Sequence, residues 1–86
     1  MTQERPEFVF MLEKVLKLAI EEEDCLSFTL AHNTDDPVEI TFSKESSYEL
    51  GQDCILIREY NKLEDKDPYF ISYLLRLNDI IYCQVI

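Results

Sequence analysis

Residues 6–30 read PEFVFMLEKVLKLAIEEEDCLSFTL, and the spacing of the apolar side chains changes within this stretch. Its first part has the 3.6-residue period of an amphipathic helix, which Pro6 can begin because the first helical residue needs no partner for its N–H. The apolar stripe consists of Phe8, Leu12, Val15, Leu16 and Ala19. From Asp24 the period becomes two, which is typical of a strand with one buried face. We therefore predict one helix, Pro6–Glu23, followed by strands.

Five strands are predicted after the helix. They cover residues 26–30, 38–43, 53–60, 69–77 and 80–86. The polar stretch Lys44–Gln52 is predicted to be a loop, and Asn78-Asp79 a tight turn. The last strand is apolar on both sides, so we expect it to pair within a closed barrel or with another chain. The predicted fold is α+β: one domain over residues 1–86, with an N-terminal helix packed on a bent antiparallel sheet or small barrel of about five strands.

The charge balance is the most unusual feature of the composition. The 86 residues include 18 acidic and 8 basic side chains, which gives a net charge of −10 at pH 7. Such a charge repels nucleic-acid phosphates and anionic lipids and attracts basic surfaces. It disfavours direct nucleic-acid binding and membrane binding, and it favours a protein partner with a basic surface. The alternative interpretation is that the charge only keeps a small protein soluble and monomeric.

Four of the acidic residues form a run, Glu21-Glu22-Glu23-Asp24, at the predicted C-terminal end of the helix. The helix dipole is negative at this end, where basic side chains would be more favourable. Such conflicts are enriched at functional sites, so we predict that this run, together with Asp35 and Asp36, binds the partner. The alternative is a solvated helix end without a function.

No pattern of residues points to catalysis or to a cofactor. His32 is the only histidine and lies in a turn-rich segment, where a lone histidine is usually solvated. Cys25, Cys54 and Cys83 lack the spacing of metal ligands, and one glycine cannot form a phosphate-binding loop. We therefore predict no catalytic residue, no metal, no cofactor and no enzyme activity, and we expect the cysteines to be buried thiols.

The expected location is the cytoplasm. The number of cysteines is odd, which favours reduced thiols over a framework of disulfides. No window of 18 apolar residues is present, and residues 1–6 lack the basic flank and the cleavage site of a signal peptide. These features predict a protein that stays where it is made.

Several aromatic residues lie in or beside the predicted strands. They are Tyr48, Tyr60, Tyr69, Phe70, Tyr73 and Tyr82. Aromatic residues on a sheet bind single-stranded RNA when basic residues accompany them, but only Arg58, Lys62 and Arg76 are available here. Core packing and the anchoring of a protein interface are the favoured roles.

The segment Leu75–Tyr82, a strand, an Asn-Asp turn and an apolar final strand, resembles the closing hairpin of Sm-like small barrels. These include the acidic Rof-type inhibitors of the transcription termination factor Rho. The resemblance covers mainly the last third of the chain, and the order of one helix and five strands is also similar. It implies a small-barrel architecture and an inhibitor role. The Sm motif with its characteristic glycine is absent, so an RNA-binding ring is not implied.

Two functions follow as hypotheses. The first is a small acidic protein-binding regulator, an inhibitor that occupies a basic nucleic-acid-binding surface of its partner. The second is a self-associating structural or Sm-like oligomeric module, with RNA binding as a further variant. The apolar surface of the helix, which is wider than one stripe, and the apolar last strand both favour self-association.

Overall fold

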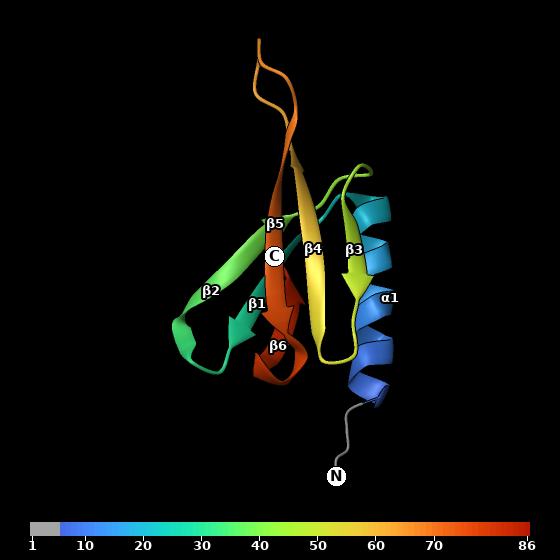
Figure 1. The fold of residues 1–86 in the computed structure, drawn as a ribbon, viewed down its shortest axis with the longest axis vertical. Coiled ribbons are helices and arrows are strands. Elements are labelled where there is room, and N and C mark those ends of the chain that lie inside the picture. The colour runs from blue at the N-terminus through green and yellow to red at the C-terminus, as the bar shows by residue number, and fades with distance from the viewer. Residues whose placement is uncertain (1–5) are drawn as a thin grey trace.

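The computed structural model describes residues 6–86, which form one α-helix, six β-strands and one short 3-10 helix (Figure 1). In chain order these are α1 (Pro6–Glu22), β1 (Cys25–Leu30), β2 (Asn33–Thr41), β3 (Ser47–Leu50), β4 (Cys54–Asn61), β5 (Tyr69–Arg76), η1 (Leu77–Asp79) and β6 (Ile80–Val85). The α+β class is confirmed. The expectation that the chain has no signal peptide was based on residues 1–6, and residues 1–5 of these lie outside the described residues.

The strands form two antiparallel sheets of three strands each, in the orders β2-β1-β6 and β3-β4-β5. We predicted a single bent sheet or barrel of about five strands. The structure has six strands, so the predicted number was wrong, and two separate sheets do not support a single bent sheet or a closed barrel. The additional strand is β3, which lies in the segment expected to be a loop and pairs with β4 from Ser47↔Arg58 to Leu50↔Ile55. The Asn78-Asp79 turn is likewise part of a 3-10 helix.

A local turn interrupts the chain between the two sheets. The Ser46 N–H donates to the Ser43 carbonyl at 3.0 Å, and the Ser43 N–H donates to the Ser46 hydroxyl at 3.0 Å. Serine side chains offer the backbone such alternatives to a ladder of strand hydrogen bonds. One strand therefore ends at Thr41 and a new one begins at Ser47, in the other sheet.

The end of α1 has the hydrogen bonding of a Schellman motif. Glu23 adopts a left-handed φ of 58°, and the Asp24 N–H donates to the Ala19 carbonyl at 2.9 Å. This position is usually a glycine, because other residues are strained at positive φ. The chain then enters β1 directly, so the end of α1 and the start of β1 are held together.

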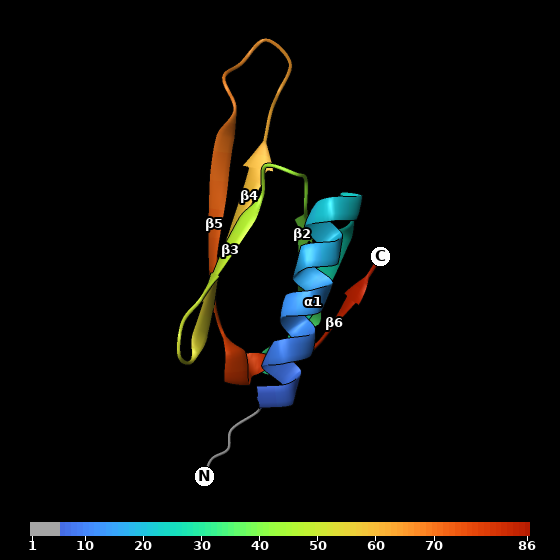
Figure 2. The same cartoon turned by 90° about the vertical axis from the view of Figure 1, so that its right-hand side faces the viewer.

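The core lies between the helix and the two sheets. Leu12, Leu16 and Ala19 of the predicted stripe are buried, and Phe8 and Val15 pack against the core. The two sheets contribute the buried residues Leu26, Phe28, Leu30, Ile40, Ile55, Ile57, Leu75 and Ile80. Phe42, directly after β2, and Leu77 of η1 join them. Figure 2 shows the sheet β3-β4-β5 on one side and β6 on the other side of α1. The hairpin of β4 and β5 extends beyond this body and lengthens the molecule to 50 Å.

No helix within residues 6–86 combines the length and the apolar character that crossing a bilayer requires.

Candidate docking surfaces

The acidic run lies on the surface at the end of α1. Glu21, Glu22 and Glu23 are exposed, and Asp24 is half-buried. The backbone of Asp24 is fixed from two sides, because its N–H donates to Ala19 and its carbonyl accepts from the Phe42 N–H at 2.9 Å. Among residues 6–86, no side chain forms an ion pair with the run. The three exposed glutamates are thus open to a partner, next to an Asp24 whose backbone is held by hydrogen bonds.

Asp35 and Asp36 do not join this run. Both are exposed in β2, in an irregular stretch where the register changes between the pairs Phe28↔Val38 and Leu30↔Asn33. Glu21–Asp24 precede the opposite end of β1, so the two groups lie about 15 Å apart at a rise of about 3.4 Å per residue. Figure 1 shows the end of α1 and the start of β2 on opposite sides of the molecule. The six predicted residues therefore form two acidic groups.

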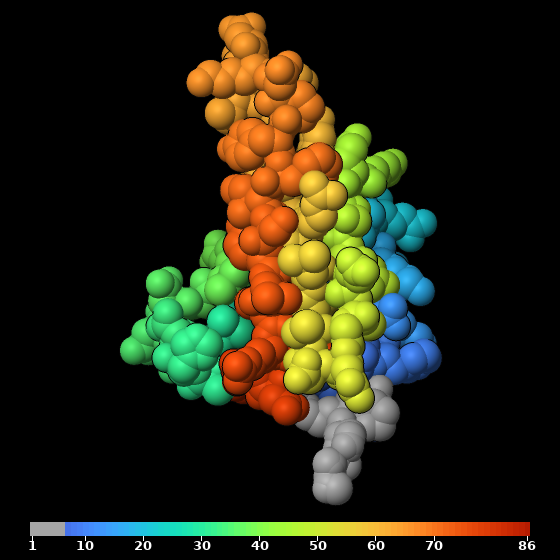
Figure 3. All heavy atoms as spheres, viewed as in Figure 1, coloured from blue at the N-terminus to red at the C-terminus, as the bar shows by residue number. Residues whose placement is uncertain are grey.

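The strand β5 forms a third surface. Its aromatic residues were predicted to pack in the core or to anchor an interface, but its free edge was not predicted. Its residues Tyr69, Phe70 and Ile71 are 43%, 42% and 39% exposed, and Leu74 is 70% exposed. The strand pairs with β4 on one side and with no other strand of the described chain on its other side. In Figure 3, β5 runs along the front of the molecule with no other segment over it. An uncovered edge with apolar side chains on both faces is a candidate for pairing with another chain.

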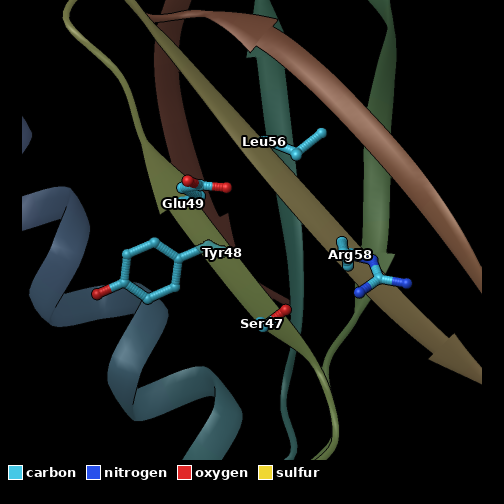
Figure 4. Close-up of a pocket in the computed structure, with 5 residues that line it drawn as sticks. All are labelled: Ser47, Tyr48, Glu49, Leu56 and Arg58. Atoms are coloured by element: carbon cyan, nitrogen blue, oxygen red, sulfur yellow. The ribbon is translucent and has the colours of Figure 1, made fainter.

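An arginine on this surface lies over an aromatic ring, which in turn contacts a second ring. The guanidinium carbon of Arg58 lies 4.4 Å from the centre of the Phe70 ring, and the Tyr60 ring meets Phe70 edge to face at 5.5 Å and 66°. The pairs Arg58↔Ser72 and Tyr60↔Phe70 place these side chains on one face of the sheet, together with Leu56 and Leu74. We call this side the outer face of β4 and β5. Figure 4 shows Leu56 and Arg58 leaving β4 on the side away from α1, whereas Tyr48 points towards the helix.

The opposite face of β4 carries a buried acid, Glu59, which is 7% exposed. Its Oε2 accepts the Thr41 N–H at 2.9 Å, and its Oε1 accepts the Tyr73 hydroxyl at 3.0 Å and the Asn61 Nδ2 at 3.3 Å. Thr41 ends β2 in one sheet, and Glu59 and Tyr73 belong to the other. The side chain of Glu59 therefore joins the two sheets. Burial, followed by the Glu59 carboxyl group, raises the pKa of Tyr73.

A second tyrosine joins α1 to β3. The Tyr48 hydroxyl donates to Glu13 Oε2 at 3.1 Å, and burial and this carboxyl group raise the pKa of Tyr48. Both tyrosine–glutamate pairs lie where elements of the fold meet, which gives them a structural role. Only Glu59 gave a signal in the sequence, because it continues the alternation of Ile55 and Ile57 and so lies on the face that is buried.

An apolar depression lies between the helix and the last strand. It is lined by Phe8, Met11, Leu12, Val15, Tyr82 and Cys83. Burial raises the pKa of the Cys83 thiol, so this thiol is neutral at pH 7 and a weak nucleophile. The depression contains no charged side chain.

The residues weighed for chemistry lie apart. His32 is exposed at the turn between β1 and β2, and the cysteines are free. Within residues 6–86 no three or more His, Cys, Asp or Glu side chains are placed so that they could hold a metal ion.

Comparisons of the chain with known protein families, with curated proteins and with solved structures found no match.

Proposed function

We propose that this chain is a small acidic regulator that binds a partner protein through Glu21–Asp24 and inhibits it by occupying a basic, nucleic-acid-binding surface. The proposal is supported mainly by the exposure of this acidic run, its lack of ion pairs and the hydrogen bonds of its backbone. Its three glutamates are exposed, Asp24 is half-buried, and none of the four has an ion-pair partner in the described chain. The backbone of Asp24 is held by hydrogen bonds to α1 and to Phe42. A preformed acidic surface loses little entropy when it binds.

The whole molecule supports this docking electrostatically. At a net charge of −10, the chain is attracted to a basic surface before any contact is made. Complementary charge of this kind raises the association rate and excludes acidic or neutral partners. Asp35 and Asp36 would strengthen the field but cannot share one small contact with the run.

The proposed relation is to Sm-like small barrels and, among them, to the acidic Rof-type inhibitors of Rho. It is supported by the helix at the start, the antiparallel strands and the segment Leu75–Tyr82, which places a 3-10 helix between two strands. The two sheets share one core, as a small barrel would. The free thiols of the three cysteines support a location in the cytoplasm.

The proposal is tested by reversing charge at two places. The variant Glu22→Lys/Glu23→Lys and the matched control Asp35→Lys/Asp36→Lys change the net charge equally, at exposed positions. Each protein is used to capture partners from nuclease-treated lysate over a series of salt concentrations. We expect basic nucleic-acid-binding proteins to be retained by the wild type and the control and to be lost with the first variant. Equal retention by all three would contradict the proposal.

A second candidate function is self-association, which two of the four sheet edges, β5 and β6, favour. Residues 69–75 of β5 and residues 80–85 of β6 contain no charged residue and no proline. Proteins usually protect such edges with charges, proline or bulges. A protein that assembles through its sheet edges would keep these edges free of charged residues and proline. Light scattering at micromolar to millimolar concentration should then show a species larger than 10.2 kDa.

A further inference from the structure

We propose that the free edge of β5 binds an extended peptide segment of another protein, which adds a strand to the sheet and places a carboxylate side chain on Arg58. This surface is separate from the acidic run, and the inference does not depend on the proposed regulatory role.

The first support is the edge itself. Backbone groups of β5 that point away from β4 have no strand partner in residues 6–86, and an added strand would pair with them. Leu74 is the most exposed large apolar residue of the described chain, at 70%, and Phe70 lies on the same face. Alternate apolar residues of an added strand would cover these two side chains. The main chain would supply affinity, and the side chains would supply specificity.

The second support is the state of Arg58. Its guanidinium lies over the Phe70 ring, and this contact favours one position of the side chain before binding. It forms no ion pair with a described side chain, although Glu49 lines the same depression. A stacked guanidinium keeps its N–H donors free at its edge, and these donors match the two oxygens of a carboxylate. Arg76 is less suited to this role because it shares its depression with Asp53 and Asp79.

The geometry allows one residue of the added strand to reach Arg58. Neighbouring strands lie about 4.8 Å apart, so the added strand would run about 10 Å from β4. Arg58 pairs with Ser72, whose short side chain leaves the space between Phe70 and Leu74 open. A glutamate opposite Ser72 and the long side chain of Arg58 together span this distance.

Charge decides against two other occupants. The apolar edges of a second copy, β5 and β6, carry no acidic residue that could meet Arg58. Its acidic edges, β2 and β3, belong to a chain of net charge −10, which repels another copy of itself. A nucleic acid could stack on Tyr60 and Phe70, but its many phosphates are repelled by the net charge of −10. A peptide with a single carboxylate in a neutral, apolar context suffers much less repulsion.

The test uses two synthetic peptides, acetyl-Thr-Val-Thr-Glu-Thr-Val-Thr-amide and the same peptide with Gln in place of Glu. Both are titrated into the ¹⁵N-labelled full chain at low salt. We expect amide signals of residues 69–76 to shift, and we expect the Glu peptide to bind about threefold to tenfold more tightly, as for one charge-assisted contact. In the Arg58→Gln variant, the difference between the two peptides should disappear.

Two exposed apolar positions provide a matched comparison. Leu74→Ser should weaken the binding of both peptides, and Ile81→Ser on β6 should leave it unchanged. The inference is overturned if the signals of β6 shift in place of those of β5, or if Arg58→Gln leaves the preference for Glu intact. It is also overturned if the signals of β5 change with protein concentration alone, which indicates a second copy. Binding of an oligothymidine at β5 without binding of either peptide would assign the surface to nucleic acid.

Discussion

Glu59 is the residue on which the joining of the two sheets depends most. It accepts hydrogen bonds from Thr41 at the end of β2 and from Tyr73 on β5, and it is itself buried. Removing the acceptor leaves buried donors without a partner, which costs more than a hydrogen bond contributes when it forms. The carboxyl group therefore acts as a substitute for the strand pairing that ends at Thr41.

We expect Glu59→Ala to lower the free energy of unfolding by about 2–4 kcal/mol, because the donors on Thr41, Tyr73 and Asn61 lose their acceptor and a cavity is left. Glu59→Gln keeps one acceptor oxygen and should cost less. Tyr73→Phe removes one donor together with its bond and should cost least, about 1 kcal/mol. Denaturant unfolding of the three variants measures the order. A Glu59→Ala protein as stable as the wild type would show that the contact is not needed.

The raised pKa values of Tyr48 and Tyr73 predict a loss of stability in alkali. In the unfolded chain a tyrosine releases its proton near pH 10, whereas the folded chain retains it to higher pH. The unfolded state then binds fewer protons than the folded state, so stability falls as the pH rises through this range and is fully present below it. The Tyr48→Phe/Tyr73→Phe protein should lose less stability between about pH 9.5 and 11. Unfolding midpoints measured across this range provide the test, and parallel curves would contradict it.

At the scale of elements, the end of α1 combines a strained backbone with unfavourable charge. Glu23 occupies the left-handed position of the Schellman motif without being a glycine. A non-glycine residue at this φ costs about 1–2 kcal/mol. Glycine removes this cost, but its greater flexibility in the unfolded chain offsets part of the gain in stability. We expect Glu23→Gly to stabilise the fold by about 0.5–1 kcal/mol.

The control for this change is Glu23→Ala, which also removes the charge but keeps the strain. Thermal unfolding of the two variants separates strain from charge. If both variants gain the same stability, repulsion within the acidic run and not the backbone is the cause. If Glu23→Gly alone is more stable, the strain is confirmed, and its retention in the natural chain is consistent with a use for the acidic side chain.

The elements could be predicted where one residue period dominated. The helix and its buried stripe follow from the 3.6-residue period, and the hairpin of β1 and β2 follows from alternation. The start of β2 was missed because Asn33 and Asp36 are residues that favour turns. The segment is nevertheless a strand, because Asn33 pairs with Leu30. Pro37 is tolerated because β2 lies at a sheet edge. β3 was missed because four residues are too few to show a period.

The β5 surface could not be predicted for a different reason. Residues 55–57 and 69–75 are both apolar on two sides, yet β4 lies in the middle of its sheet and β5 at the edge. Only the strand order distinguishes them. Likewise, the stacking of Arg58 on Phe70 depends on the register of the hairpin, which the sequence does not specify.

Over the whole molecule, charge and exposed apolar surface are separated along the chain. Residues 54–86 contain four of the eight basic and five of the 18 acidic side chains, so this part is close to neutral. It also carries most of the exposed large apolar residues of the described chain, on β5, β6 and the hairpin loop. The strongly acidic part comprises α1 and the first three strands. Two kinds of contact, one acidic and one apolar, can therefore coexist on one small protein.

This separation predicts opposite responses to salt. Docking of the acidic run on a basic partner should weaken as salt rises, because attraction between surface charges is screened over about 8 Å at physiological ionic strength. Self-association through β5 or β6 should strengthen, because two copies of net charge −10 repel each other and the edges themselves carry no charge. Sedimentation of the chain alone between about 20 and 500 mM salt measures the second effect. A growing share of dimers with salt, reduced by Ile81→Lys on β6 or Leu74→Lys on β5, would locate the contact at that edge. A monomer at every salt concentration would remove self-association and leave the two edges for other proteins.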